Sequence, residues 1–384
     1  MRYSTERILT THVGSLPRPH DLLDMLKARL DGDDIDETAF QSKLRDAVDR
    51  MVAAQVDAGI DVVADGEMSK PGHAVYVNER LEGFEPRPDK EMGLYREERE
   101  AFPEYYEEYF RNAHLGGAIA RAAPMVCVGD IRYVGHGDLR TDLENLRAAV
   151  DKHGCGEAFM PCAAVTGVGS NEYYSTEEAY LSALADAIAE EYKAIVEAGF
   201  LLQVDDPFLP NVYMDDTLDE RERDRKVGMY VEAINHSLKD IPEEKVRFHT
   251  CYGINQGPRV HEPDLPDMID QVLAVRAGAY SFEAGNPRHE HEYHLWENVR
   301  LPEGKLVAPG VVTHATSVVE HPDYVAERIV RFAERVGREN VLASTDCGFS
   351  SQATYKTEVE PRIVWAKLRA LSEGAKRASE ILWR

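Results

Sequence analysis

The regular alternation of short apolar runs with longer amphipathic segments is the feature that most limits what this chain can fold into. Helical patterns end on glycine at 40–59 and 177–199, and others are expected at 218–238, 323–336 and 360–380. This alternation over 384 residues predicts an α/β fold with a parallel sheet, and its regularity favours one (β/α)8 TIM barrel spanning residues 1–384. Nine runs resemble buried strands, at residues 7–15, 61–67, 123–131, 158–167, 201–207, 245–253, 279–286, 305–314 and 340–348.

A barrel has eight strands, so one of these runs is spare. We assign that role to 123–131, because it follows the least regular part of the chain, about residues 80–122, which is charged and rich in Tyr and Glu. We expect residues 80–122 to form a helical insertion in one βα loop. It would cover the barrel mouth or make a subunit contact in a homo-oligomer.

Composition excludes several classes of partner. The formal net charge of −25 repels phosphate backbones, which argues against nucleic acid. The chain contains no run of 18 apolar residues, so we expect no membrane span. The N-terminus lacks the apolar region of a secretory signal. Five cysteines are an odd number in a long chain, which argues against a disulfide framework and favours a reducing cytoplasm.

The run "RFHTCYG" places His249 and Cys251 two residues apart on one strand, so both side chains point the same way. Taken alone, this spacing is more typical of a buried thiol beside a hydrogen-bonded histidine. Two other strands, however, end in Glu283 and Cys347. The carboxyl ends of barrel strands meet at one mouth, where these four side chains would form a ligand set that zinc accepts. Cys127, Cys155 and Cys162 are interpreted as ordinary buried thiols.

The motifs "HTCYG", "FEAGN", "DCGF", "TTHVGSLPRP", "VVADGEMSKP" and "LQVDDP" resemble those of the cobalamin-independent methionine synthase family, specifically its catalytic barrel. The resemblance runs from about residue 7 to the C-terminus. It is strongest to the short, single-barrel members, which include epoxyalkane–coenzyme M transferase. It implies that His249, Cys251, Glu283 and Cys347 hold a catalytic Zn²⁺ that binds the acceptor thiol.

The same resemblance implies the substrate contacts. The segment "HVGS" would bind the amino-acid part of homocysteine through Ser15 and its neighbours His12 and Gly14. Glu67 and Asp205 match carboxylates that hold the substrate amino group, although capping a helix is the alternative for Asp205. Arg18 is a candidate anion contact.

Two histidine features remain open. His314, at the end of the strand 305–314, matches a proton donor of the family, and the alternative is a structural histidine. The run "RHEHEYH" at 288–294 invites a second metal site, but it has no zinc spacing of its own, and we expect a solvated polar loop.

The resemblance implies a zinc-dependent thiol alkyltransferase, with methyl transfer to homocysteine as the leading activity. The alkyl donor is left open between a folate, a corrinoid protein and an epoxide, because the negative charge suits a polyglutamylated folate poorly. The alternatives are an epoxyalkane–coenzyme M transferase and, in another class, a non-catalytic zinc or thiol sensor.

Overall fold

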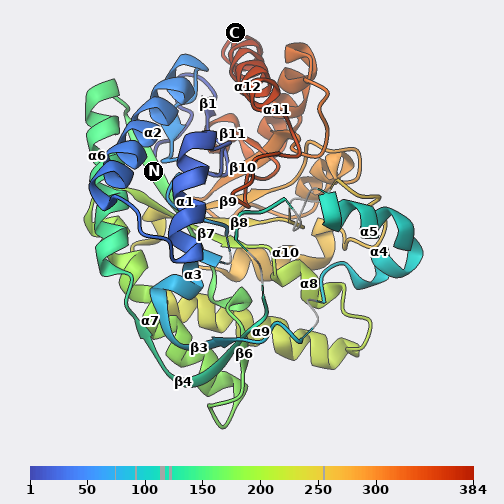
Figure 1. Ribbon diagram of the computed structural model, residues 1–384. Helices are drawn as coiled ribbons and strands as arrows, with labels where there is room; N and C mark the ends of the chain where they lie inside the picture. Colours follow the sequence, from blue (N-terminus) through green and yellow to red (C-terminus); the bar gives the residue numbers. More distant parts are fainter. Residues whose placement is uncertain (74, 91–92, 113–116, 121–122, 254–255) are drawn as a thin grey trace.

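Eight parallel strands form a nearly closed barrel surrounded by helices in the computed structural model (Figure 1). The structure describes residues 1–384 except 74, 91–92, 113–116, 121–122 and 254–255. The predicted (β/α)8 barrel is confirmed, and eight of the nine predicted runs supply its strands. In spatial order these are β1 (Leu9–Thr10), β11 (Leu342–Thr345), β10 (Leu306–Val312), β9 (Ala279–Phe282), β8 (Val246–Thr250), β7 (Leu201–Asp206), β5 (Glu157–Ala163) and β2 (Val62–Val63).

The barrel closes between its two shortest strands, β1 and β2, which have only two residues each. The backbone N–H of Asp61 donates to the carbonyl of Thr10 at 3.1 Å. The Thr11 hydroxyl donates to the carbonyl of Val62, also at 3.1 Å. Side-chain hydrogen bonds therefore replace part of the ladder at this seam.

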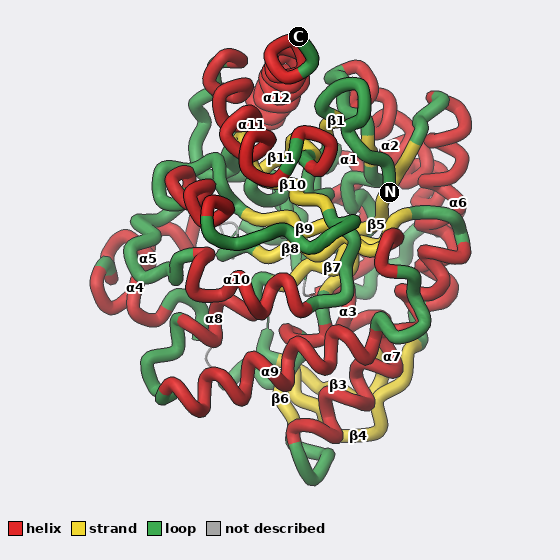
Figure 2. The backbone as a smooth tube through the Cα atoms, turned by 180° about the vertical axis from the view of Figure 1, so that it is seen from behind, coloured by secondary structure: helices red, strands yellow, loops and turns green. Residues whose placement is uncertain are grey.

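The ninth run lies outside the barrel, as predicted. It forms β4 (Met125–Tyr133), which belongs to a second sheet with the order β3–β4–β6, where β3 is Leu81–Pro86 and β6 is Ser170–Asn171. Figure 2 shows this small sheet apart from the barrel strands. The expectation of a helical insertion over about residues 80–122 was wrong at its start, because residues 81–86 form β3, which pairs antiparallel with β4. The run "LEGFEP" has no β-branched residue, so its sequence lacks the usual strand signal.

The rest of the insertion contains two helices, α4 (Arg96–Ala101) and α5 (Pro103–Asn112). Residues 91–92, 113–116 and 121–122 of the predicted insertion lie outside the described residues.

Long helices pack around the barrel. Five of them coincide with the predicted patterns, whereas α1, α6 and α10 were not predicted. No helix in the described ranges is both long enough and apolar enough to cross a membrane. The helices are α1 (His20–Asp31), α2 (Glu37–Asp57), α6 (His136–His153), α7 (Glu177–Glu197), α9 (Glu220–Ser237), α10 (Leu265–Ala274), α11 (Pro322–Val336) and α12 (Pro361–Leu382), with the short α3 (Val75–Arg80) and α8 (Leu209–Tyr213).

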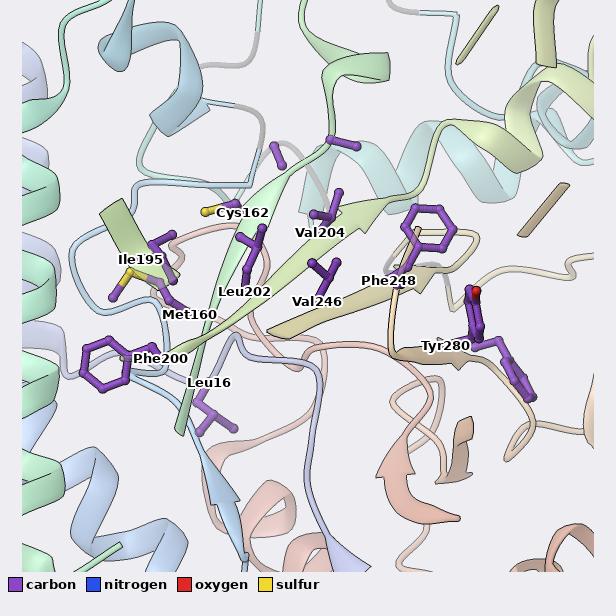
Figure 3. Close-up of a cluster of buried hydrophobic side chains, with 14 of the residues drawn as sticks. Leu16, Met160, Cys162, Ile195, Phe200, Leu202, Val204, Val246, Phe248 and Tyr280 are labelled. Atoms are coloured by element: carbon purple, nitrogen blue, oxygen red, sulfur yellow. The ribbon is translucent and has the colours of Figure 1, made fainter. Parts of the chain in front are cut away.

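Alternation along the central strands separates the apolar core from the polar residues of the barrel. On β8, Val246 and Phe248 join the large buried cluster drawn in Figure 3. Arg247 points the other way and donates to the Thr11 hydroxyl and the His12 carbonyl, both at 3.0 Å. His249 follows Arg247 by two residues and lies on the same face. This register positions the first of the predicted metal ligands at the barrel mouth.

Candidate functional site

Three of the four predicted metal ligands converge at the carboxyl ends of β8 and β11. The nearest ligand atoms of His249, Cys251 and Cys347 all lie within 4.8 Å of one another, and the side chains are buried. The two sulfur atoms are 3.4 Å apart, and both cysteines are free. Two thiols and an imidazole, held this close together, are the donor groups of a zinc site.

The imidazole of His249 is prepared to bind a cation. Its Nδ1 lies 3.1 Å from the hydroxyl of Ser281, which fixes the ring. Its buried Nε2 has no hydrogen-bond partner among the residues that the structure describes. Burial, followed by the charge of Arg247, lowers the pKa of His249 to about 3, so the ring is neutral at pH 7. A neutral imidazole with one fixed and one open nitrogen is the form that ligates metals.

The Cys347 thiol is protonated when no cation lies beside it. The hydrogen bond with Cys251, together with burial, raises the pKa of Cys347 well above its ordinary value. A zinc ion would reverse this preference, because a coordinating thiol is deprotonated. The residues present therefore fit zinc in donor type, spacing and burial.

Glu283, the fourth predicted ligand, lies beside this group, and its carboxylate is hydrogen-bonded to other residues. Its Oε2 accepts hydrogen bonds from Arg259 Nη2 at 2.7 Å and Asn286 Nδ2 at 2.9 Å. Its Oε1 accepts from the backbone N–H of Tyr252 at 3.2 Å. Burial raises the pKa of Glu283 to about 7, although Arg259 lowers it.

A cavity of about 740 Å³ opens above the His249, Cys251 and Cys347 group. Its barrel side includes Ser15, Glu67 and Asp205, three of the predicted substrate contacts. Lys90, Leu94 and Tyr95 of the insertion line the same cavity, as do Phe208 and Met125.

Glu67 and Asp205 form a buried acidic pair in the wall of this cavity. Burial raises the pKa of Glu67 above the ordinary carboxyl value, against the lowering effects of Lys70 and Arg18. Burial and then the charge of Glu67 raise the pKa of Asp205 well above its ordinary value. Both pKa values would fall if a cation bound between the carboxylates, so the pair is suited to a substrate ammonium group.

The backbone at Glu67 is unusual. Its φ of 58° places a residue with a side chain in the left-handed region, and its N–H donates to Asp65 Oδ1 at 2.9 Å. Such strain persists where the surrounding structure holds it, and it is enriched at functional sites. Asp206 has a different task from Asp205, since it caps the turn before α8 by accepting from Phe208 N at 2.9 Å.

Arg18, His12 and Gly14 lie behind the cavity wall instead of lining it. Arg18 is buried and donates to the carbonyls of Glu67 at 3.0 Å and Ser350 at 2.8 Å. His12 Nε2 lies 2.7 Å from Gln55 Oε1 on α2. Gly14 has a φ of +133°, and a Cβ there would approach Pro161 to 2.8 Å. Arg18 therefore holds the backbone of Glu67, whereas His12 and Gly14 support the wall through Gln55 and Pro161.

His314 is buried beside Glu283 and Asp346, and the ligand atoms of all three lie within 4.8 Å of one another. It is not among the residues that line the cavity. Burial and the charge of Arg259 lower the pKa of His314 well below its ordinary value. The described imidazole is therefore neutral, and acting as a proton donor would require a negatively charged group of the substrate to raise its pKa, because a bound cation would lower it further.

The histidine-rich run is only in part the solvated loop that we expected, because His291 and His294 are exposed whereas other members are not. His289 and Glu292 are buried, and the run enters a 3₁₀ helix at Glu290–Glu297. His289 lies 3.0 Å from Glu262 and 3.2 Å from Glu292, and it stacks on Tyr252 at 4.4 Å between ring centroids. Burial lowers the pKa of His289, but hydrogen bonds to Glu262 and Glu292 raise it to about 9. Internal ion pairs thus explain why His289 and Glu292 are buried.

Glu358, which the sequence did not indicate, lines the cavity in the segment after Cys347. Tyr109 of α5 donates to its Oε1 at 2.8 Å, which ties the insertion to this segment. Burial raises the pKa of Glu358 from 4.5 to about 7.

Replacing Glu358 with glutamine should therefore change how stability depends on pH. Because the folded-state pKa is raised, the contribution of Glu358 is fully present below about pH 4.5 and is lost as the pH rises through 7. Between these pH values, the free energy of unfolding of the Gln variant should rise by about 2–3 kcal/mol relative to that of the natural protein. Denaturant unfolding at pH 5 and pH 8 measures this change. The exposed Glu104→Gln on α5 is the control, and an equal difference at both pH values would contradict the prediction.

Comparisons with known proteins identify the family and the fold of the chain. The family model described as "Cobalamin-independent synthase, Catalytic domain" matches residues 8–131 and 115–366. A methionine synthase of Sulfolobus acidocaldarius is 26% identical over 341 residues, covering 88% of this chain and 85% of the relative. That of Thermococcus kodakarensis is 26% identical over 371 residues, covering 95% and 91%.

The fold has a solved counterpart. A B12-independent methionine synthase from a Shewanella species, in complex with selenomethionine, superposes with a TM-score of 0.70 at 20% identity, covering 98% of this chain and 99% of that chain. The family model matches most of the chain, and the barrel places its motifs at one mouth. The chain therefore belongs to the cobalamin-independent methionine synthase family.

Proposed function

We propose that this protein is a zinc-dependent methyltransferase that transfers a methyl group to the thiol of homocysteine and forms methionine. The observation that carries the proposal is the sharing of one cavity by the His249, Cys251 and Cys347 group and by the buried acidic pair of Glu67 and Asp205. The names of the curated relatives, which are methionine synthases, support the same activity.

In this proposal His249, Cys251, Cys347 and Glu283 hold the Zn²⁺. The ion would deprotonate the substrate thiol and keep the thiolate nucleophilic at neutral pH. The two cysteines suit a soft, sulfur-rich site, and the carboxylate is the weakest donor of the set.

The substrate-facing residues would orient the amino acid. Glu67 and Asp205 accept hydrogen bonds from its ammonium group, and Ser15 contacts its carboxylate. Arg18 acts from behind, because it donates to the carbonyl of Glu67 and holds that residue in its left-handed conformation. Holding both ends of the amino acid would direct its sulfur toward the metal ligands and lower the entropic cost of reaction.

The insertion would form the opposite wall, where the methyl donor binds. Leu94 and Tyr95 line the cavity ahead of α4, and Met125 does so at the start of β4. We propose that this segment covers the mouth and excludes water from the reacting atoms.

The test is a mass-spectrometric thiol assay of zinc-replete protein. Homocysteine and coenzyme M are each offered with methyltetrahydrofolate, methylcobalamin and epoxypropane. Methionine as the product is the expected result, and it identifies the donor in the same experiment. A hydroxyalkyl thioether of coenzyme M would instead assign the epoxide-opening activity. No product in any combination would contradict the proposed function.

A further inference from the structure

Arg259 makes the shortest contact to the carboxylate of Glu283, at 2.7 Å. The arginine is only 4% exposed and follows Cys251 by eight residues in the same loop. The neighbouring Tyr252 donates its backbone N–H to the other oxygen of Glu283 at 3.2 Å. The carboxylate therefore lies between a metal-ligand loop and a buried cation.

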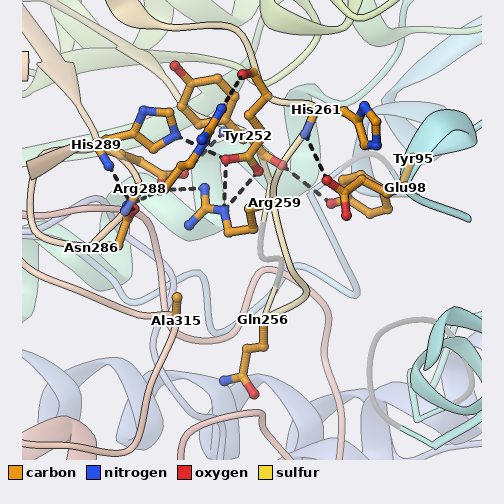
Figure 4. A network of polar contacts seen from close by, with 12 residues as sticks. Tyr95, Glu98, Tyr252, Gln256, Arg259, His261, Asn286, Arg288, His289 and Ala315 are labelled. Carbon is orange, nitrogen blue, oxygen red and sulfur yellow. Dashed lines mark hydrogen bonds and ion pairs between the residues drawn. The ribbon is translucent and has the colours of Figure 1, made fainter. Parts of the chain in front are cut away.

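A chain of ion pairs fixes the position of Arg259 (Figure 4). Its Nε donates to both oxygens of Glu262, at 2.8 and 2.9 Å. Glu262 contacts His289, which contacts Glu292, and Glu292 accepts from Leu265 N at the start of α10. The guanidinium is thus anchored on one side and offers its other side to Glu283. This anchoring accounts for the burial of His289 and Glu292 within the histidine-rich run.

The backbone of Arg259 is also strained. Its φ of 60° lies in the left-handed region, where a residue with a long side chain is rare. The insertion reinforces this conformation, because Glu98 of α4 accepts from the backbone N–H of His261 at 2.9 Å. Strain of this kind at a ligand site is a reason to ask what the side chain does there.

We propose that Arg259 is a positioning residue that takes over the carboxylate of Glu283 when the substrate thiolate binds the metal. The inference rests on the proposed function. In the exchange, the bond between the metal and the carboxylate oxygen breaks, and a bond between the metal and sulfur forms. The thiol proton goes to solvent, and Glu283 stays ionised on Arg259.

The physical reason is the cost of an unpaired buried charge. Without Arg259, a carboxylate released from the metal in this water-poor site would have no counter-charge. The cost of that unpaired buried charge would oppose its release. Arg259 supplies a charge-assisted hydrogen bond in a fixed geometry, so release requires only a short movement. The metal can then accept the thiolate without adding a further ligand.

Cobalt(II) in place of zinc provides the measurement, because each sulfur bound to cobalt adds to the charge-transfer absorption. L-homocysteine is titrated into the cobalt-loaded natural protein and into Arg259→Met. We expect the natural protein to gain absorption, and we expect Arg259→Met to need at least ten times more thiol. Competition with a chelator should show that Arg259→Met holds the metal as tightly as the natural protein or more tightly.

Three further variants separate positioning from folding. Arg259→Lys keeps the charge, so it should recover most of the thiol affinity, and it also serves if Arg259→Met does not fold. Arg328→Met is the matched control, because Arg328 is equally buried and pairs with Glu290 at 2.7 Å without contacting Glu283. In a Glu283→Gln background, Arg259→Met should have no further effect on thiol binding.

Two results would overturn this inference while leaving the proposed function intact. One is normal thiol affinity in metal-loaded Arg259→Met. The other is a loss of thiol affinity on adding Arg259→Met to Glu283→Gln that is as large as the loss in the natural background. If the natural protein bound no cobalt, or bound cobalt without responding to thiol, the proposed function would fail first. Cobalt binding and the thiol response of the natural protein therefore distinguish the two failures.

Discussion

Replacing Cys347 with alanine is expected to lower zinc affinity by more than 100-fold and to abolish methyl transfer. Changes in residues that only support metal ligands already cost about 10–100-fold in affinity, so loss of a ligand should cost more. Cys347 and Cys251 provide the sulfur pair at 3.4 Å, and either one alone leaves His249 with a single thiolate neighbour. Zinc content after dialysis, together with turnover, measures the effect.

Cys155→Ala is the matched control for this experiment. Cys155 is free and half-buried after α6, and it is absent from the residues that line the cavity. It should retain both zinc and activity. Full zinc content and turnover in Cys347→Ala would disprove the metal assignment.

Glu67→Gln is expected to lower kcat/KM for homocysteine by about 30- to 4,000-fold, since truncating one partner of a buried charge pair costs about 2–5 kcal/mol. The substitution preserves shape but removes the charge that faces the substrate ammonium group. Zinc content should not change, because Glu67 lies outside the metal-ligand group. Steady-state kinetics with homocysteine measures the loss.

A second thiol makes this prediction specific. 4-Mercaptobutyrate is homocysteine without the amino group, so the cobalt-loaded Glu67→Gln variant should bind it as well as the cobalt-loaded natural protein does. Asp205→Asn should behave in the same way. Equal losses for both thiols would mean that Glu67 maintains the cavity without recognising the ammonium group.

The barrel and the three-ligand group could be predicted because short sequence patterns indicate both of them. Each barrel strand is an apolar run between turn residues, and the H-x-C spacing places His249 and Cys251 on one face. The location of Cys347 then follows from the meeting of parallel strand ends. No long-range contact has to be known beyond the fold class.

The remaining features depend on partners that are distant in sequence. The run "LEGFEP" forms a strand only because β4 pairs with it, 39 residues after its end. His289 resembles a solvated histidine until Glu262 and Tyr252 enclose it. Glu283 resembles a simple metal ligand until Arg259, in a loop without a recognisable motif, reaches its carboxylate. Such ion-pair choices are set by tertiary geometry.

The two walls of the cavity have separate origins in the chain. The strand ends of the barrel supply the thiol side, whereas the segment between β2 and β5 supplies the facing wall with Lys90, Leu94, Tyr95 and Met125. Substitutions confined to that segment should change which alkyl donor is accepted while the barrel keeps its metal ligands. Under the proposed function, this architecture offers protein engineers one continuous stretch for library design, provided that Glu98, which supports the Arg259 loop, is left unchanged.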